Sequence, residues 1–209
     1  MKENVLGIVL AGGRARRMNG IDKPLALLDN RPLLAHVLAR AAPQLRDVAL
    51  VADDGARLAG FGLPIVSDAI GGFAGPLAAI AAGLDWAKSR APEDAAPSED
   101  HWLASFPCDT PFFPRDLVAR LLTGAKEAGA DIAIASSGGR IHPVFGLWRM
   151  SCAPMLHTLL EQGERKMQDA IARFSYVSVD FAAERPDPFF NINTPEDLTQ
   201  AEAWINPGA

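Results

Sequence analysis

The stretch Val5-Leu6-Gly7-Ile8-Val9-Leu10, followed at once by Ala11-Gly12-Gly13, decides the fold class of this 209-residue chain. A short apolar run rich in β-branched residues that ends on glycines is typical of a buried strand that leads into a turn. Similar strand patterns alternate with helical patterns along the rest of the chain. This alternation predicts an α/β fold with a mostly parallel sheet and helices on both of its faces.

The expected elements follow from the spacing of apolar residues and from prolines at helix starts. Strands are predicted at 5–10, 48–52, 63–67, 102–106, 131–136, 144–148 and 176–181. Helices are predicted at 32–45, 76–88, 116–128, 153–160, 167–174 and 195–204. The segment 90–100 holds two prolines and four acids, which is typical of a solvated loop. With no internal repeat and no second hydrophobic unit, residues 1–209 are expected to form one domain.

Composition and charge exclude several classes of protein. Twenty Lys and Arg residues against 25 Asp and Glu residues give a net charge of −5, which disfavours a nucleic-acid partner. No apolar run approaches the roughly 18 residues of a membrane span. The charged start of the chain is unlike a signal peptide, and two cysteines form neither a disulfide framework nor a metal cluster. A cytoplasmic protein without a membrane partner is therefore expected.

A cluster of cations follows the glycines that end the first predicted strand. Within ten residues of a chain that is acidic overall stand Arg14, Arg16, Arg17 and Lys23. Gly12 and Gly13 let backbone N–H groups approach an anion closely, and Arg forks with a Lys point charge suit a triphosphate. The segment matches neither the dinucleotide fingerprint nor the Walker loop. A glycine turn with solvated basic side chains is the alternative, and it does not explain why the cations cluster there.

A carboxylate stands at the end of a second apolar strand, in the stretch Phe106-Pro107-Cys108-Asp109-Thr110-Pro111. Open α/β sheets bind ligands at the carboxyl ends of their strands, and Mg²⁺ typically takes one or two carboxylates together with substrate phosphates. Asp109 is therefore a candidate magnesium ligand, with a turn cap as the equally weighted alternative. Since no His lies close in the sequence, Cys108 is interpreted as a packing residue.

Two asparagines alternate with an apolar residue in Asn191-Ile192-Asn193-Thr194-Pro195. Thr194 before Pro195 is typical of a helix start, which explains those two residues but not the asparagines. Residues two apart on an extended segment point the same way. Asn191 and Asn193 are therefore expected to face one ligand, with an ordinary loop as the alternative.

Weaker signals lie elsewhere in the chain. Asp68 follows a short strand, and Gly75 precedes a helix N-terminus, where anions bind well. His142 and Arg165 are predicted to lie in loops, where such residues are more often solvated than functional.

Taken together, the motifs resemble those of the MobA-like nucleotidyltransferases, over residues 5 to about 204. The resemblance is carried by Leu10-Ala11-Gly12-Gly13 with Arg17-Met18 and Asp22-Lys23, by 107–111, by 191–196, and less strongly by 75–78 and 162–165. It implies a Rossmann-like three-layer domain of the nucleotide-diphospho-sugar transferase type. The implied reaction joins GMP from GTP to the terminal phosphate of molybdenum-bound molybdopterin and releases pyrophosphate, with Mg²⁺ as cofactor. Molybdoenzyme-specific chaperones and other proteins of molybdenum cofactor biosynthesis are the implied protein partners.

The resemblance also implies roles for individual residues. The implied catalytic residues are Arg17, Lys23 and Asp109, of which Asp109 also binds the metal. The implied nucleotide site consists of Leu10, Ala11, Gly12, Gly13, Arg14, Lys23, Asp68, Gly75 and Asp109. The implied pterin-substrate site consists of His142, Arg165, Asn191 and Asn193.

One position departs from the pattern. Families of this kind often place an Asn at the strand end where this chain has Val51. Val51 lacks a polar side chain, so either Asp53 or a backbone group substitutes, or base selection is looser. A cytidylyl or sugar-phosphate nucleotidyltransferase therefore stays open, as does a non-catalytic cofactor carrier, although paired glycines, an intact Asp109 and the basic segment favour the guanylyl enzyme.

Overall fold

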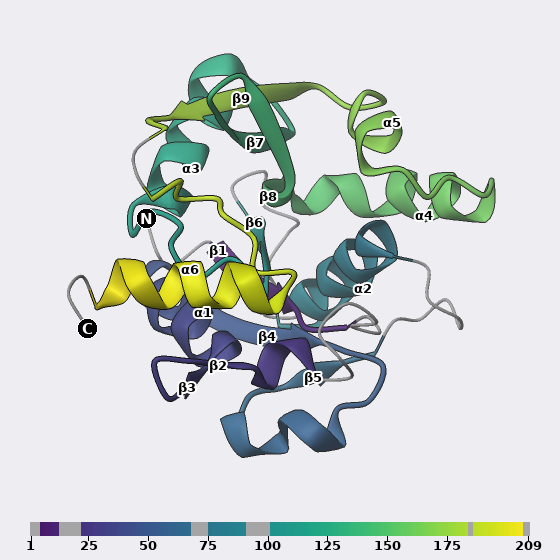
Figure 1. The fold of residues 1–209 in the computed structure, drawn as a ribbon. Helices are drawn as coiled ribbons and strands as arrows, with labels where there is room; N and C mark the ends of the chain where they lie inside the picture. The colour runs from purple at the N-terminus through teal and green to yellow at the C-terminus, as the bar shows by residue number, and fades with distance from the viewer. Residues whose placement is uncertain (1–4, 13–21, 68–74, 91–100, 184–185, 207–209) are drawn as a thin grey trace.

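The computed structural model describes residues 5–12, 22–67, 75–90, 101–183 and 186–206. A seven-stranded sheet runs through the molecule in the order β5-β4-β1-β6-β8-β7-β9 (Figure 1). Its strands are β1 (Val5–Leu10), β4 (Asp47–Val51), β5 (Ile65–Val66), β6 (Trp102–Pro107), β7 (Ile132–Ser137), β8 (Arg140–Arg149) and β9 (Tyr176–Phe181). Only β8 runs antiparallel to its neighbours, so the predicted mostly parallel α/β fold is confirmed.

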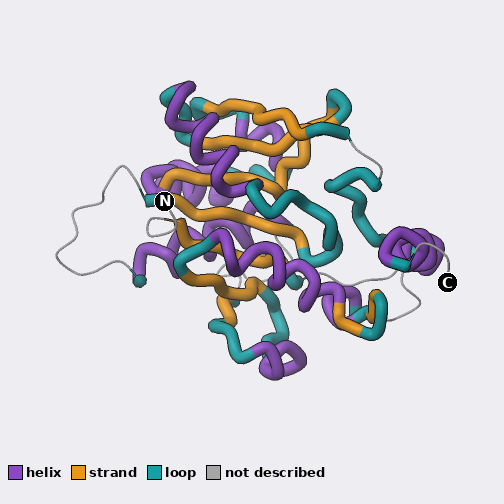
Figure 2. Tube along the Cα trace, turned by 90° about the vertical axis from the view of Figure 1, so that its left-hand side faces the viewer, coloured by secondary structure: helices purple, strands orange, loops and turns teal. Residues whose placement is uncertain are grey.

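Helices cover both faces of the sheet, and Figure 2 shows them in front of and behind the stacked strands. On one face α1 (Leu33–Ala41) and α3 (Leu117–Ala128) contribute to a buried apolar cluster. On the other face α2 (Pro76–Ser89), α4 (Ala153–Glu161) and α5 (Met167–Ile171) contribute to a second cluster. The two clusters make the strands of the sheet apolar on both sides, as expected for a parallel sheet between helical layers.

Smaller elements complete the described chain. Four 3-10 helices are η2 (Lys23–Leu25), η3 (Ala42–Gln44), η4 (Ala56–Phe61) and η5 (Met150–Cys152). The C-terminal helix α6 (Pro195–Ile205) packs with a hairpin formed by β2 (Leu27–Leu28) and β3 (Arg31–Pro32) in a third, small apolar cluster. No helix among the described residues is long and apolar enough to cross a membrane.

Most predicted elements lie within a few residues of the observed ones, but one predicted helix end was wrong and one hairpin was missed. The helix predicted at 32–45 ends at Ala41 and continues as a 3-10 turn, because Pro43 has no backbone N–H for an α-helical hydrogen bond. The β2–β3 hairpin was not predicted. Its turn residues Asp29 and Asn30 both have positive φ, and Asp and Asn are the residues that adopt that conformation most readily after Gly.

The prediction that His142 lies in a loop was also wrong, because β8 begins at Arg140 rather than at 144. Ala135 of β7 pairs with His142, whereas the preceding Ile134 pairs with Gly146, so residues 143–145 form a bulge in the strand. Pro143 cannot donate to the sheet and is therefore suited to such a bulge. Ser105 stabilises it, since its buried hydroxyl donates to Val144 O at 2.7 Å.

The order of the strands creates a cleft at one edge of the sheet. After β1, the chain adds β4 and β5 on one side and then returns to place β6 on the other side. The carboxyl ends of β1 and β6 therefore lie next to each other where the direction of winding reverses, which is where open α/β sheets bind ligands. Glycine-rich and acidic motifs follow those two strands, as the sequence predicted.

Candidate functional site

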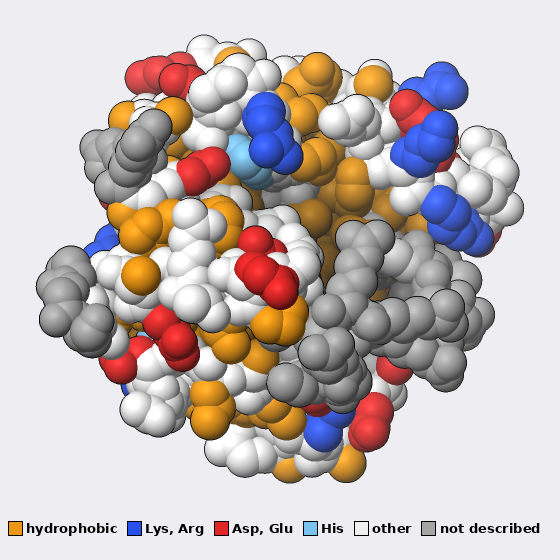
Figure 3. All heavy atoms as spheres, in the orientation of Figure 1, with side chains coloured by type: hydrophobic (Ala, Val, Ile, Leu, Met, Phe, Trp, Pro, Cys, Tyr) orange, Lys and Arg blue, Asp and Glu red, His pale blue; other side chains and the backbone are white. Residues whose placement is uncertain are grey.

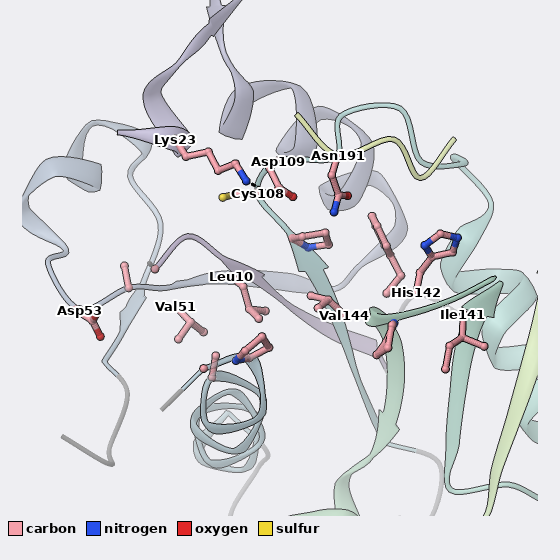
Figure 4. A pocket seen from close by; sticks show the side chains of 18 of the residues that line it. Leu10, Lys23, Val51, Asp53, Cys108, Asp109, Ile141, His142, Val144 and Asn191 are labelled. Carbon is pink, nitrogen blue, oxygen red and sulfur yellow. Dashed lines mark hydrogen bonds and ion pairs between the residues drawn. The ribbon is translucent and has the colours of Figure 1, made fainter. Parts of the chain in front are cut away.

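A cavity of about 680 Å³ lies at this edge of the sheet. Its floor is formed by the residues that follow β4, β1 and β6, and its far wall is formed by the bulged start of β8 (Figure 4). In the space-filling view, this face of the molecule is hollowed near its middle, with apolar side chains inside the hollow (Figure 3). A cavity of this size, with a few polar groups at defined points, suits a ligand of nucleotide size.

Lys23, Asp109 and Asn193 form the polar centre of the site. The Lys23 ammonium donates to Asp109 Oδ2 at 2.5 Å and to Asn193 Oδ1 at 2.6 Å. The side chains of Lys23 and Asp109 are 20% and 15% exposed, so the ion pair is shielded from water but open to a ligand. Three motifs that are far apart in the sequence are thus joined through one ammonium group.

Thr110 connects the second asparagine to the same centre. Its hydroxyl group lies 3.1 Å from Asp109 Oδ1 and 2.5 Å from Asn191 Oδ1, which it contacts as a hydrogen-bond donor. Between the asparagines, Ile192 is buried and its N–H donates to Asp109 O at 2.9 Å. The predicted alternation is therefore present: Ile192 points into the protein, and both asparagines contact the polar centre. Thr110 itself was not predicted as a site residue.

The start of α6 fixes the position of Asn193. Thr194 and Asp197 form a capping box, in which the Thr194 hydroxyl accepts from Asp197 N at 3.1 Å and the Asp197 carboxylate accepts from Thr194 N at 2.9 Å. Asp197 also accepts from Asn193 N at 2.8 Å. The predicted helix cap therefore serves the site as well, because it holds the backbone of the asparagine that contacts Lys23.

The wall formed by β8 presents an imidazole and apolar groups to the cavity. The His142 ring stacks on Phe189, with centroids 4.4 Å apart, and its Nε2 lies 2.8 Å from the Ser137 hydroxyl. Burial lowers the pKa of His142, although Asp187 opposes the shift. His142 is therefore neutral near pH 7, and it forms a flat, weakly polar surface beside the bulge residues Val144 and Phe145.

The opposite end of the cavity is formed by the end of β4, where Val51 and Asp53 lie (Figure 4). The backbone at this point is already paired: Val51 O accepts from Ala11 N at 2.9 Å, and Ala52 N donates to Val66 O at 3.1 Å. Asp53 has no hydrogen-bond or ion-pair partner in the part of the chain that the structure describes. Of the two substitutes that the sequence left open for the missing Asn, the backbone is already paired, whereas the side chain of Asp53 lines the cavity.

The structure brings most of the predicted site residues to this cavity. Those that line it are Leu10, Gly12, Lys23, Gly75, Asp109, His142 and Asn191. Asn193 joins them through Lys23, whereas Ala11 is wholly buried, does not line the cavity, and has its N–H and C=O paired with Val51 O and Arg57. Gly13, Arg14, Arg17 and Asp68 lie outside the described residues.

Arg165 does not line the cavity. Its guanidinium donates to Leu160 O at 2.8 Å, near the C-terminal end of α4, and to Glu164 O at 2.7 Å in the loop that follows. The prediction that Arg165 lies toward a pterin substrate therefore has no support in this arrangement. Val144 and Phe145 also line the cavity and were not predicted. They face the cavity because they lie in the bulge of β8. The only sign of this bulge in the sequence was Pro143 within the strand pattern.

The donor set fits a hard divalent cation that shares its ligands with phosphate. Within the described ranges no three His, Cys, Asp or Glu side chains converge on one point, so no cage made of protein groups alone is present there. Asp109 and Asn193 nevertheless place two oxygens around one cation, the Lys23 ammonium. A carboxylate and a carboxamide oxygen suit Mg²⁺, which completes its coordination with phosphate and water.

Three comparisons relate this arrangement to known proteins. The family described as the MobA-like NTP transferase domain matches residues 7–177. A molybdenum cofactor guanylyltransferase of Bradyrhizobium sp. (strain ORS 278) is 48% identical, over 95% of this chain and 92% of its own length. One of Rhodopseudomonas palustris (strain BisB5) is 46% identical, over 93% of this chain and 91% of its own length.

Solved structures agree with the fold. The molybdopterin-guanine dinucleotide biosynthesis protein A of Archaeoglobus fulgidus superposes with a TM-score of 0.73 and 25% identity, over 97% of this chain and 99% of its own. A CMP:2-keto-3-deoxy-manno-octonic acid synthetase in complex with CTP superposes with a TM-score of 0.72 and 16% identity, over 98% of this chain and 99% of its own. The second likeness shows the nucleotide-diphospho-sugar transferase type of fold alone.

The environment of Cys108 predicts that its thiol is inert. Burial, with a smaller effect of Asp109, raises the pKa of Cys108 to about 12, although the residue lines the cavity. At pH 8 only about one thiol in 10⁴ is then ionised, and the thiolate is the reactive form. We expect iodoacetamide to label Cys108 of the native protein at least about a hundredfold more slowly than free cysteine. Cys152 is the internal control, because burial also raises its pKa to about 12. If Cys108 alone were labelled, and nucleotide blocked that labelling, the packing role of Cys108 would be contradicted.

Proposed function

Since the chain belongs to the MobA-like NTP transferase family, we propose that it transfers GMP from GTP to the terminal phosphate of molybdenum-bound molybdopterin and releases pyrophosphate. The observation that carries the proposal is the Lys23 ammonium held between Asp109 and Asn193 at the reversal point of the sheet. The molybdenum cofactor guanylyltransferases of Bradyrhizobium and Rhodopseudomonas, which align with nearly the whole chain, support the choice of base and acceptor. We also propose that residues 1–209 form one domain of this family.

The chemistry requires two anions to approach each other. An oxygen of the pterin phosphate forms a bond to the α-phosphorus of GTP, while the bond from that phosphorus to the pyrophosphate oxygen breaks. The attacking phosphate is already ionised near pH 7, so no residue has to remove a proton from it. Charge neutralisation and alignment then account for the rate, and these are what Lys23 and the surrounding oxygens can supply.

We infer that Asp109 and Asn193 hold Mg²⁺ together with the phosphates of the nucleotide. A divalent cation bound there neutralises phosphate charge, which lowers the barrier to attack by another anion. Lys23 contacts the same two oxygens, and its flexible stem lets it turn toward a phosphate. Arg14 and Arg17, outside the described residues, are proposed to bind the leaving pyrophosphate.

The two ends of the cavity are proposed to bind different substrates. The nucleoside of GTP lies toward Gly12, Gly75 and Asp53, where the Asp53 carboxylate lines the cavity. Molybdopterin lies toward His142 and Asn191, where the flat imidazole and the apolar bulge suit a fused ring. A cytoplasmic location and transfer of the product to molybdoenzyme-specific chaperones remain predictions from the family resemblance.

Removal of the Asp109 carboxylate tests the reaction directly. With GTP, Mg²⁺ and molybdenum-loaded molybdopterin, the wild-type protein is expected to release one pyrophosphate for each dinucleotide formed. Asp109→Ala is expected to lower kcat by about a hundredfold or more, the size of effect that follows loss of one transition-state charge contact. Lys23→Ala is expected to weaken GTP binding as well, since the ammonium beside that carboxylate is the group proposed to contact the phosphates.

The matched control is Asp85→Ala, which removes an exposed carboxylate that pairs with His157 instead of lining the cavity. It is expected to keep the wild-type kcat. Equal rates in Asp109→Ala and Asp85→Ala at saturating Mg²⁺ would contradict the role of Asp109. Absence of pyrophosphate release from the wild-type protein with GTP would contradict the proposed reaction.

Asp53 is predicted to select guanine. Guanine presents two adjacent donors, N1–H and the 2-amino group, and a carboxylate accepts both, whereas cytosine and adenine place an acceptor beside a donor. Asp53→Asn replaces one acceptor oxygen by a donor and is expected to reduce the preference for GTP over CTP in kcat/KM about tenfold or more, because a hydrogen bond to a charged group is lost.

Asp54→Asn is the control for Asp53, since Asp54 is the adjacent acid, its carboxylate caps Ala56 N at 3.1 Å and it does not line the cavity. It is expected to leave the ratio of kcat/KM for GTP and CTP unchanged. The same ratio in both variants would show that Asp53 does not read the base.

A further inference from the structure

An arginine that lies outside the cavity connects three segments of the chain near the cavity. Arg57 lies on η4 and is not among the residues that line the cavity. Its Nε donates to Asp54 O at 3.1 Å, its Nη2 donates to Ala11 O at 2.9 Å, and its Nη1 forms an ion pair with the Asp22 carboxylate. The planar guanidinium thus holds three acceptors at once in a fixed arrangement, which a Lys ammonium on a flexible stem does not do.

Two of those acceptors lie on either side of the glycine-rich segment. Ala11 is the residue that follows β1, and its own N–H donates to Val51 O, so its backbone is already fixed against β4. Asp22 is the residue before Lys23. Through Arg57, the position of Asp22 is therefore set relative to the rigid end of the sheet.

Asp22 in turn sets the start of the Lys23 side chain. Asp22 O accepts from Leu25 N at 2.9 Å, so Asp22 is the N-cap of the 3-10 helix η2, whose first residue is Lys23. At the other end of its stem, the Lys23 ammonium contacts Asp109 and Asn193. A continuous series of contacts thus runs from Arg57 through Asp22 to the polar centre of the site.

The contacts of Arg57 contribute little to the apolar core. The next residue, Leu58, is wholly buried, and together with the partly buried Phe61 it anchors η4 in the core. The side chains of Arg57 and Asp22 are 24% and 28% exposed, so water can replace either partner when the other is removed. Loss of Arg57 is therefore expected to free Asp22 and Lys23 locally without unfolding the sheet.

We propose that Arg57 is a positioning residue that acts through Asp22 to hold Lys23 where phosphate charge is neutralised. The inference rests on the proposed nucleotidyl transfer for its effect on rate, but not for its effect on the local structure around Lys23. It adds to the site a residue that lies 34 positions after Lys23 in the sequence and touches neither substrate.

The first test measures pyrophosphate release by Arg57→Ala, Arg57→Lys and the control Arg90→Ala. Arg90 forms a more exposed ion pair with Asp47, outside the cavity, so its loss is expected to leave kcat unchanged. Arg57→Ala is expected to lower kcat about tenfold or more with a smaller rise in KM, because misplacement of Lys23 matters most where charge develops. Arg57→Lys is expected to restore part of the rate.

A second arm separates positioning from general stability. Adding Asp22→Ala to Arg57→Ala is expected to cost no further rate, since both residues act through one contact. Hydrogen exchange of the nucleotide-free proteins is expected to speed up about tenfold in the peptide that contains 22–28 in Arg57→Ala, and to stay unchanged in β1 and β6. This arm needs no substrate, so it tests Arg57 even if GTP is not the nucleotide.

Three results would overturn the proposal. The first is an Arg57→Ala variant whose kcat and hydrogen exchange equal those of the wild type. The second is a double variant whose loss of rate equals the product of the losses in the two single variants, and the third is faster hydrogen exchange throughout the sheet in Arg57→Ala. The last would assign Arg57 to stability alone. A different result would reject the proposed function and keep the role of Arg57. In that result, the wild-type and Arg90→Ala proteins do not use GTP, but hydrogen exchange in Arg57→Ala is faster only in residues 22–28.

Discussion

The Lys23 ammonium shared by Asp109 and Asn193 is the contact on which the site depends. It joins side chains from the segments that follow β1, β6 and β9 through one group. The pair is partly shielded from water, where an unpaired Asp109 would be costly and an unpaired Lys23 would have no defined position. The ammonium therefore keeps the two oxygens oriented, and a phosphate group of a ligand can replace either oxygen as the partner of the ammonium.

The fold supplies this contact because three backbone features converge at one edge of the sheet. The return of the chain past β1 places the end of β6 beside the end of β1. The capping box of α6 holds Asn193, and the hydrogen bond from Ile192 N to Asp109 O brings the two segments together. The bulge in β8 then forms the wall of the cavity that faces the end of β4. Binding and alignment of two anionic substrates, without proton transfer by a side chain, is the chemistry that such a site supports.

The sequence predicted the α/β fold and most of the site, because glycine, Asp109 and the asparagines each stand at a strand end or helix start that periodicity reveals. It did not predict that His142 lies in a strand, since pairing across the three-residue bulge depends on contacts with β7. The sequence also did not show that the Arg165 guanidinium contacts a carbonyl near the end of the preceding helix α4, because a loop arginine can bind such a group as readily as a ligand. Arg57 gave no signal at all: its role arises only from the position of three acceptors in space.

A crystal structure with a non-hydrolysable GTP analogue and Mg²⁺ tests the central claim most directly, because it shows where Lys23 points when phosphate is present. The account predicts that the Lys23 ammonium leaves Asp109 for a phosphate oxygen, that the guanine lies beside Asp53, and that Asp109 and Asn193 face the cation. A nucleotide bound away from this cavity, or a Lys23–Asp109 pair unchanged beside bound phosphate, would contradict it.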